Sequence, residues 1–145
     1  MIILGHIHLK VRNLKRAEKF YTELFGFKVN ERVGSYIFLT FGKKHHDLAL
    51  QEVGENAPQP EEYAVGLYHF ALELDNRKQL ALLYKKLGEN KIPVSPVDHG
   101  ISEALYFEDP DGNGIEVYVD TRHKAKKWGG KTRLLDTEKL ISLVE

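Results

Sequence analysis

Two histidines and one glutamate occupy positions in this sequence from which they could bind a metal ion together. His6 lies in the segment GHIHLKV and His69 in YHFALEL, and the two segments begin alike. Glu116 lies far downstream, in DPDGNGIEVYVD. Two imidazoles and a carboxylate hold a divalent metal and leave coordination positions open, a set associated with ferrous oxygen chemistry. We therefore treat these three residues as candidate metal ligands.

The two histidine-headed segments belong to a unit that occurs twice in the chain. Counted from His6 and His69, Tyr21 and Tyr84 both fall 15 residues further on. A supersecondary unit used twice can bring residues that are distant in sequence onto one inner surface. The repeat therefore makes the two histidines equivalent positions.

Side-chain alternation gives the three candidate ligands a common direction. Successive side chains of a strand point to opposite faces, and the apolar face of each strand must cover a helix. His6, His69 and Glu116 each fall on the opposite, inward face. The expected helix-facing residues are Ile7, Leu9 and Val11, then Phe70, Leu72 and Leu74, then Ile115, Val117 and Val119.

His8 is an alternative ligand, because it lies two residues from His6 and shares its face. Taken singly, a histidine on a strand is more often a structural residue than a ligand, and Glu116 alone could cap a turn or pair with a lysine. The register with His69 favours His6 over His8.

The pair of histidines in GKKHHDLAL offers a proton-transfer group. We expect His46 to share the inward face with Leu48 and Leu50 and to relay protons or stabilise an anionic oxygen near the metal. We expect His45 to lie in a solvated turn.

Two further residues of the second half complete the candidate site. His99 begins the loop HGISEAL, and Tyr106 lies 10 residues before Glu116, on the adjacent expected strand. A metal site that carries out a reaction needs acid and base groups close by. We therefore assign His99 and Tyr106, together with His46, to the reacting site, although Tyr106 alone would also suit a core aromatic position.

Hydrophobic periodicity predicts an α+β domain built from two units of one strand, one helix and three strands. Each helix has an asparagine or aspartate at its start and a glycine at its stop. The expected strands cover residues 2–11, 27–32, 36–41, 47–53, 67–74, 93–97, 104–108 and 114–120. The expected helices run from Asn13 to about Phe25, ended by Gly26, and from Asp75 or Asn76 to about Leu87, ended by Gly88.

The expected organisation is a single domain over residues 1–145. It consists of module one over about 2–54, a polar linker over about 55–64, module two over about 65–120 and a tail over 121–145. In the tail we expect a solvated basic run, and at most a short amphipathic helix over residues 136–144.

Composition removes several function classes. Lys and Arg total 21, as do Asp and Glu, so no sequence-wide field favours nucleic acid or an acidic membrane. The chain has no cysteine, which excludes disulfides and thiolate ligands and leaves nitrogen and oxygen to hold any metal. No apolar run approaches the roughly 18 residues of a membrane-spanning helix. We therefore expect a cytoplasmic protein with no nucleic-acid or membrane partner.

From Gly5 to Asp120 the chain resembles the vicinal oxygen chelate superfamily, and most of all its single-domain, catechol 2,3-dioxygenase-like extradiol dioxygenases. The segments GHIHLKVRNLKRAEKFYTELFGF and ALYFEDPDGNGIEVY carry the likeness. The resemblance implies paired βαβββ modules that form an open barrel-like mixed sheet with helices outside. It also implies a homodimer, a catechol-like substrate, O2 and a role in aromatic catabolism.

Carried over to this sequence, the resemblance makes His6, His69 and Glu116 the ligands of Fe(2+), with Mn(2+) or another divalent metal as the alternative. It makes His46 the acid/base group. It gives His99 and Tyr106 contacts with the substrate and bound oxygen.

The same superfamily leaves other functions open. Its glyoxalase-like isomerases and epimerases add a Glu or Gln ligand in the first half, where this chain has Leu50 with Glu52 nearby, on what we expect to be the same inward face. Its fosfomycin-type thiol transferases use the same two-histidine, one-glutamate set with manganese. Its bleomycin resistance-like members bind a ligand without chemistry.

Overall fold

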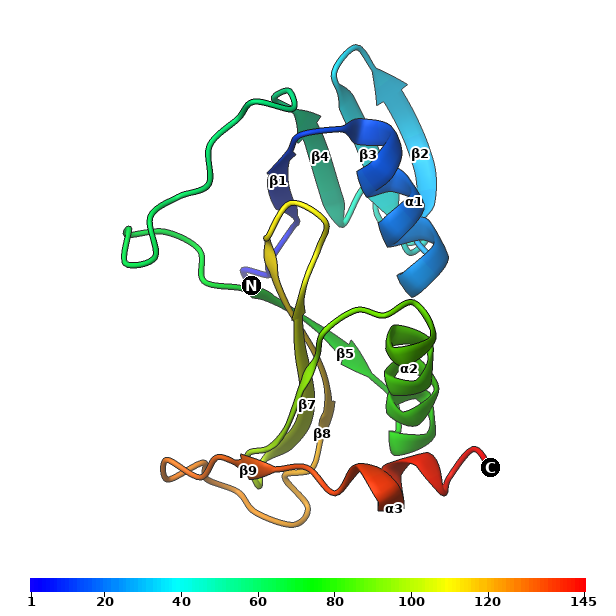
Figure 1. Cartoon of the computed structure of the whole chain (residues 1–145), viewed down its shortest axis with the longest axis vertical. Helices are drawn as coiled ribbons and strands as arrows, with labels where there is room; N and C mark the ends of the chain where they lie inside the picture. The colour runs from blue at the N-terminus through cyan, green and yellow to red at the C-terminus, as the bar shows by residue number, and fades with distance from the viewer. The chain divides into compact units, whose positions relative to one another are not determined.

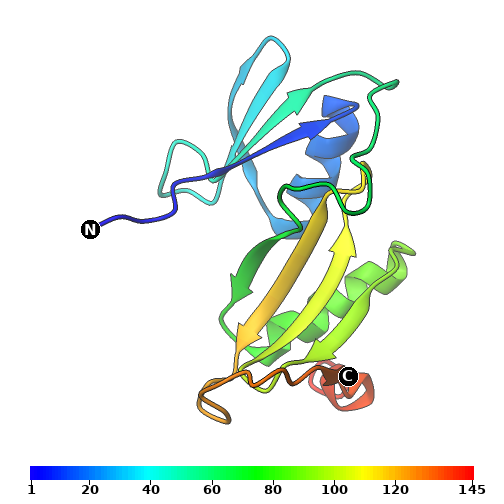
Figure 2. The ribbon, with the colours of Figure 1, turned by 90° about the vertical axis from the view of Figure 1, so that its left-hand side faces the viewer.

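The computed structural model describes all residues from Met1 to Glu145. Its contacts divide the chain into two compact units, here called unit 1 (residues 1–66 and 109–113) and unit 2 (residues 67–108 and 114–145). Each unit contains one mixed β-sheet with a long helix on one face (Figures 1 and 2). No helix of the chain has the length and apolar character needed to cross a membrane.

Unit 1 contains one βαβββ module, whose four strands form a sheet in the order β1-β4-β3-β2. Strands β1 and β4 run parallel, and the other pairs are antiparallel. The elements are β1 (Ile7–Val11), α1 (Leu14–Phe25), β2 (Lys28–Val33), β3 (Tyr36–Thr40) and β4 (Leu48–Glu52).

Local sequence sets both ends of α1 where we predicted them. The Asn13 side chain accepts a hydrogen bond from the backbone N–H of Arg16 at 2.9 Å, which caps the first turn. Gly26 takes the left-handed conformation with φ 77°, and its N–H donates to the carbonyl of Thr22. The helix buries Ala17 and Tyr21 completely, so it contributes its apolar side to the core of unit 1.

Unit 2 repeats the module and adds one short strand and one short helix. Its five strands lie in the order β5-β8-β7-β6-β9, with β5 and β8 parallel. The elements are β5 (Phe70–Leu74), α2 (Arg77–Glu89), β6 (Ser95–Asp98), β7 (Ser102–Glu108), β8 (Gly114–Asp120), β9 (Arg133–Leu134) and α3 (Thr137–Ile141).

The predicted α+β class and the repeated βαβββ order are confirmed, while most element bounds differ from those predicted by one or more residues. Strands β1 and β5 begin at Ile7 and Phe70, later than predicted, because the residues before them have no partner strand. Helix α2 continues through Gly88 to Glu89, since a glycine inside a helix costs only about 1 kcal/mol relative to alanine. Strand β9 in the tail was not predicted.

Residues 109–113 of the turn between β7 and β8 pack within unit 1. Both carboxylate oxygens of the buried Asp109 accept hydrogen bonds. Oδ1 accepts from the backbone N–H groups of Asp111 and Asn113 at 2.9 Å each, and Oδ2 accepts from the Tyr21 hydroxyl at 2.7 Å and the Asn113 side chain at 2.9 Å. Burial and the neighbouring carboxylate raise the pKa of Tyr21, so its hydroxyl remains a donor.

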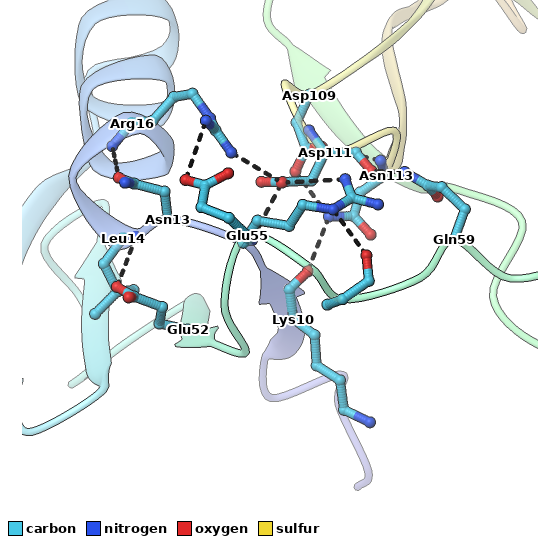
Figure 3. A network of polar contacts seen from close by, with 12 residues as sticks. Lys10, Asn13, Leu14, Arg16, Glu52, Glu55, Gln59, Asp109, Asp111 and Asn113 are labelled. Atoms are coloured by element: carbon cyan, nitrogen blue, oxygen red, sulfur yellow. Dashed lines mark hydrogen bonds and ion pairs between the residues drawn. The ribbon is translucent and has the colours of Figure 1, made fainter.

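The same turn is bound by Arg12, which precedes α1, and by Arg16 in the first turn of α1 (Figure 3 shows Arg16). The Asp111 carboxylate accepts from the backbone N–H of Arg12 at 3.1 Å and lies 3.4 Å from an Arg16 guanidinium nitrogen. Asn113 donates to the carbonyl of Lys10 at 3.3 Å. Because these bonds reach the residues at either side of Val11, they fix the end of β1 and the beginning of α1.

The Tyr21→Phe substitution tests whether this turn contributes to stability. We expect it to lower the free energy of unfolding by about 2 kcal/mol, because it removes a buried hydrogen bond to a carboxylate. Chemical denaturation of the whole chain measures the change. Tyr84→Phe, at the equivalent repeat position in α2, is the matched control and should change stability by less than about 0.5 kcal/mol. Equal losses in the two variants would contradict the assignment.

Candidate active site

His69 and Glu116 meet on the face of the unit 2 sheet that points away from α2. His69 directly precedes β5, and Glu116 lies beside Ala71 in the parallel pairing of β5 and β8. His69 Nε2 lies 3.0 Å from Glu116 Oε2. Two ligands held about 2.1 Å from one metal at a right angle are roughly 3 Å apart, so this spacing fits two neighbouring ligands.

The His69 ring has a nitrogen with no partner. Its Nδ1 is buried and makes no hydrogen bond. The nitrogen that faces Glu116 is Nε2, so Nε2 and not Nδ1 is the atom that would bind a metal shared with Glu116. A donor set of imidazole nitrogen and carboxylate oxygen suits a divalent transition metal. The pair in unit 2 therefore fits the metal that the sequence predicts.

Tyr106 and His99 extend this pair into a hydrogen-bonded row. The Tyr106 hydroxyl donates to Glu116 Oε1 at 3.0 Å, from the position directly opposite Glu116 on β7. His99 Nε2 lies 2.8 Å from the same hydroxyl. Burial, and then the bond to Glu116, raise the pKa of Tyr106, so the phenol stays protonated.

The tail contributes to this row, which the sequence did not indicate. His99 Nδ1 lies 3.0 Å from the Lys131 carbonyl, and the Trp128 indole packs edge-on against the His99 ring. The Trp128 N–H donates to that carbonyl at 2.6 Å. The basic side chains of this run are largely exposed, as predicted, although Trp128 and the Lys131 backbone contact His99. The single tryptophan was the only signal in the sequence that the tail packs against the sheet.

In unit 1 the rings of His6 and His46 pack against each other, with centroids 4.3 Å apart. The backbone N–H of Ile7 donates to the Asp47 carbonyl at 3.0 Å, which joins the two short segments that carry these histidines. Burial and the neighbouring His6 lower the pKa of His46, so its ring is neutral at physiological pH. The alternative ligand His8 instead hydrogen-bonds Gln51 at 3.1 Å.

Strand β4 is one residue out of phase with the direction we predicted. Leu48 and Leu50 lie beside Ile7 and Leu9 on the helix-facing side, not inward. Glu52, which we also placed inward, accepts a hydrogen bond from the Leu14 backbone N–H at the start of α1. The segment LAL is buried at all three positions, so alternation could not show its direction. The inward residues are Ala49 and Gln51.

His45 was predicted to be a solvated turn residue, and it is exposed but not free. Its Nε2 lies 2.8 Å from Glu31, and its Nδ1 lies 2.9 Å from Nδ1 of His46.

Each unit by itself holds part of the predicted ligand set. His69 and Glu116 belong to unit 2, and His6 belongs to unit 1. The structure brings together no group of three or more His, Cys, Asp or Glu side chains spaced to hold a metal ion. The three-ligand set therefore stays a prediction, of which the pair in unit 2 has suitable geometry.

Comparison with known proteins gives a family match that spans the candidate residues. The model of the Glyoxalase/Bleomycin resistance protein/Dioxygenase superfamily matches residues 3–117. The catechol-2,3-dioxygenase of Bacillus subtilis (strain 168) is 41% identical over 117 residues, which cover 81% of this chain and 41% of that protein. The biphenyl-2,3-diol 1,2-dioxygenase 3 of Rhodococcus globerulus is 33% identical over 119 residues, covering 81% and 63%.

This chain thus spans less than two thirds of the length of either relative. Among solved structures, a glyoxylase/bleomycin resistance protein/dioxygenase domain from Frankia sp. EAN1pec aligns with a TM-score of 0.72 and 19% identity. The alignment covers 88% of this chain and 99% of that one, so the two share a fold.

The Gly114→Ala substitution tests how closely β8 must approach His69. An added Cβ would lie 2.5 Å from the Tyr68 carbonyl oxygen and 3.1 Å from His69 Cβ, so His69 has to move. We expect weaker binding of a divalent metal, measured by calorimetric titration of the metal-free protein.

Gly88→Ala is the control for this substitution, because a Cβ there meets nothing within 4 Å. It should leave metal binding unchanged and stabilise α2 by about 0.5–1 kcal/mol. Unchanged metal affinity in Gly114→Ala would show that His69 is not held by this contact.

Proposed function

We propose that this chain is an extradiol-type dioxygenase. It belongs to the Glyoxalase/Bleomycin resistance protein/Dioxygenase superfamily, whose model matches residues 3–117. Its substrate would be a catechol-like vicinal diol, which O2 opens beside the two hydroxyl groups. The observation that carries the proposal is the 41% identity to a catechol-2,3-dioxygenase over 81% of the chain. A second relative is named for a biphenyl-2,3-diol, which is also a vicinal diol on an aromatic ring.

We propose that His6, His69 and Glu116 hold the metal of this enzyme, Fe(2+) first and Mn(2+) or another divalent ion as the alternative. The 3.0 Å approach of His69 Nε2 and Glu116 Oε2 supports two of the three ligands. The metal would supply the charge and electron transfer that allow a diol and O2 to react at one place.

The remaining residues would position the substrate and move its protons. The neutral ring of His46 can accept a proton from a substrate hydroxyl, since a lowered pKa keeps a nitrogen lone pair free. Tyr106 donates to Glu116 and so fixes the orientation of that carboxylate. His99, whose Nε2 lies 2.8 Å from the Tyr106 hydroxyl, would contact substrate oxygen from the same side.

A glyoxalase-like isomerase is the second candidate function. That chemistry calls for a further Glu or Gln ligand in the first half, and Gln51 lies on the inward face of β4 with its amide oxygen 3.1 Å from His8. Glu52, which we considered for this role, faces the other way, as does the apolar Leu50 at the position where we placed the family's ligand. Thiol transfer and binding without catalysis have no comparable support in the structure.

Anaerobic reconstitution tests the proposed dioxygenase. The protein is loaded with Fe(2+), then given air and a panel of catechols that includes biphenyl-2,3-diol. We expect a yellow ring-cleavage product from at least one compound, because a metal-held diol is poised for attack next to its hydroxyls. The measurement is visible absorbance against time, with iron content determined on the same sample.

His69→Ala should lose both iron and activity, whereas the control His8→Ala should keep both. Stoichiometric iron with no product from any catechol would rule out the dioxygenase, and turnover of a hemithioacetal by the same sample would favour the isomerase. Failure to bind any divalent metal would favour a binding protein. Retention of stoichiometric iron by His69→Ala would show that the ligand set is wrong.

We also propose that the protein is a homodimer. The apolar residues Ile2, Ile3 and Leu4 are exposed next to β1, an edge strand of its sheet, and a second copy of the chain would cover them. Sedimentation velocity should give a dimer, and Ile3→Lys should convert it to monomer by placing charge in the interface. A monomeric wild-type protein at micromolar concentration would overturn this proposal.

A further inference from the structure

Three side chains of unit 1 form a hydrogen-bonded row that ends at the predicted acid/base group. Glu31 Oε1 lies 2.8 Å from His45 Nε2, and His45 Nδ1 lies 2.9 Å from His46 Nδ1. The two imidazoles meet edge to face, at an interplanar angle of 86°. The contact with His45 therefore uses Nδ1 of His46, and Nε2 of His46 takes no part in the row.

A β-bulge aims Glu31 at this row. In the pairing of β2 with β3, Val29 lies opposite Leu39 and Glu31 lies opposite Phe38, so Asn30 is the extra residue. Without the bulge, Glu31 would share the helix-facing side with Val29, because residues two apart on a strand point the same way. The bulge instead places the carboxylate on the face of Phe38, and bulges often re-aim a side chain beside a site.

The loop that carries the two histidines is itself fixed. Asn30, the bulge residue, donates through its side chain to the His45 carbonyl at 2.8 Å. The Phe38 ring packs against both imidazoles, with centroids 5.5 Å from His45 and 5.0 Å from His46. Thr40 donates to the Lys44 carbonyl at 2.7 Å. The rings are therefore held by backbone and packing contacts as well as by each other.

The order of donors along the row follows from the chemistry of its ends. A carboxylate only accepts, so His45 Nε2 must carry the proton that reaches Glu31. In a neutral His45 ring, Nδ1 is then the acceptor, and His46 Nδ1 must donate to it. A neutral His46 ring that donates through Nδ1 keeps its lone pair on Nε2. The row thus selects one of the two tautomers of His46.

We infer that Glu31 and His45 are positioning residues that hold the His46 ring and fix its Nδ1–H tautomer. This rests on the proposed function in one respect, since it makes His46 Nε2 the atom that receives a proton from the substrate hydroxyl. The Glu31 carboxylate sets the tautomer of His46 through the ring of His45. The bulge in β2 places Glu31 where it can do so. Neither Glu31 nor His45 touches the substrate in this account.

An exposed ion pair alone contributes little to stability, so stability does not test the inference. The direct test is the tautomer of His46. Nitrogen-15 spectra of the histidine side chains of the whole, metal-free protein, at a pH of about 8 where imidazoles are neutral, distinguish protonated from unprotonated ring nitrogens. We expect His46 to be protonated at Nδ1 and not at Nε2.

Glu31→Ala and His45→Ala should each shift His46 toward the Nε2–H form. The matched control is Glu18→Ala, which breaks the ion pair of Glu18 with Arg32, the neighbour of Glu31 on β2. This control should leave the His46 tautomer unchanged. An Nε2–H tautomer in the wild-type protein, or a tautomer that does not respond to either row variant, overturns the inference. A response to His45→Ala alone removes Glu31 from it.

A second measurement uses ring cleavage in the iron-loaded protein. Glu31→Ala should lower kcat about tenfold, equivalent to about 1.4 kcal/mol, with little change in KM, because substrate binding does not involve Glu31. Glu31→Gln, which keeps an acceptor oxygen, should recover part of the loss. If wild type shows the Nδ1–H tautomer but cleaves no catechol, the proposed function fails and the positioning role stands. Wild-type kcat in Glu31→Ala, with the tautomer shifted, overturns the role in catalysis.

Discussion

Each sheet of this protein buries one face beneath a helix, and that constraint places the polar residues of the candidate site. Residues of β8 alternate between the buried Ile115, Val117 and Val119 and the inward Glu116 and Tyr118. Burial of the apolar set under α2 is favourable by roughly 25 cal/mol per Å², whereas a misplaced carboxylate would cost several kcal/mol. The direction of Glu116 is therefore fixed by its apolar neighbours more than by its own contacts.

Alternation along the strands sets the direction of each side chain, and polar contacts then fix its position more closely. In unit 2, the row from His99 through Tyr106 to Glu116 and His69 joins β7 and β8 to the residue after β6, the residue before β5 and, through the Lys131 carbonyl, the tail. In unit 1, a bulge overrides the alternation so that Glu31 can reach His45. The row in unit 2 follows the regular alternation of strand side chains, whereas the row in unit 1 depends on the bulge in β2.

Sequence reasoning succeeded where alternation was clean and failed where it was interrupted. In unit 2, the inward direction of Glu116 follows from β8, whose apolar and polar residues alternate strictly, and Tyr106 lies opposite Glu116 on β7, which lacks such alternation. The direction of Leu50 could not be inferred, because its strand is buried on both faces. The Glu31 row was missed because a bulge leaves no mark in the hydrophobic pattern, and the contact of Trp128 with His99 because it depends on how the tail folds back.

The central proposal is that His6, His69 and Glu116 bind one metal ion. X-ray absorption at the iron edge of the anaerobic Fe(2+) protein counts imidazoles in the coordination shell. The account predicts two in the wild-type protein and in His8→Ala, and one in His6→Ala, provided that each sample contains stoichiometric iron. The same imidazole count in His6→Ala as in the wild-type protein would contradict it.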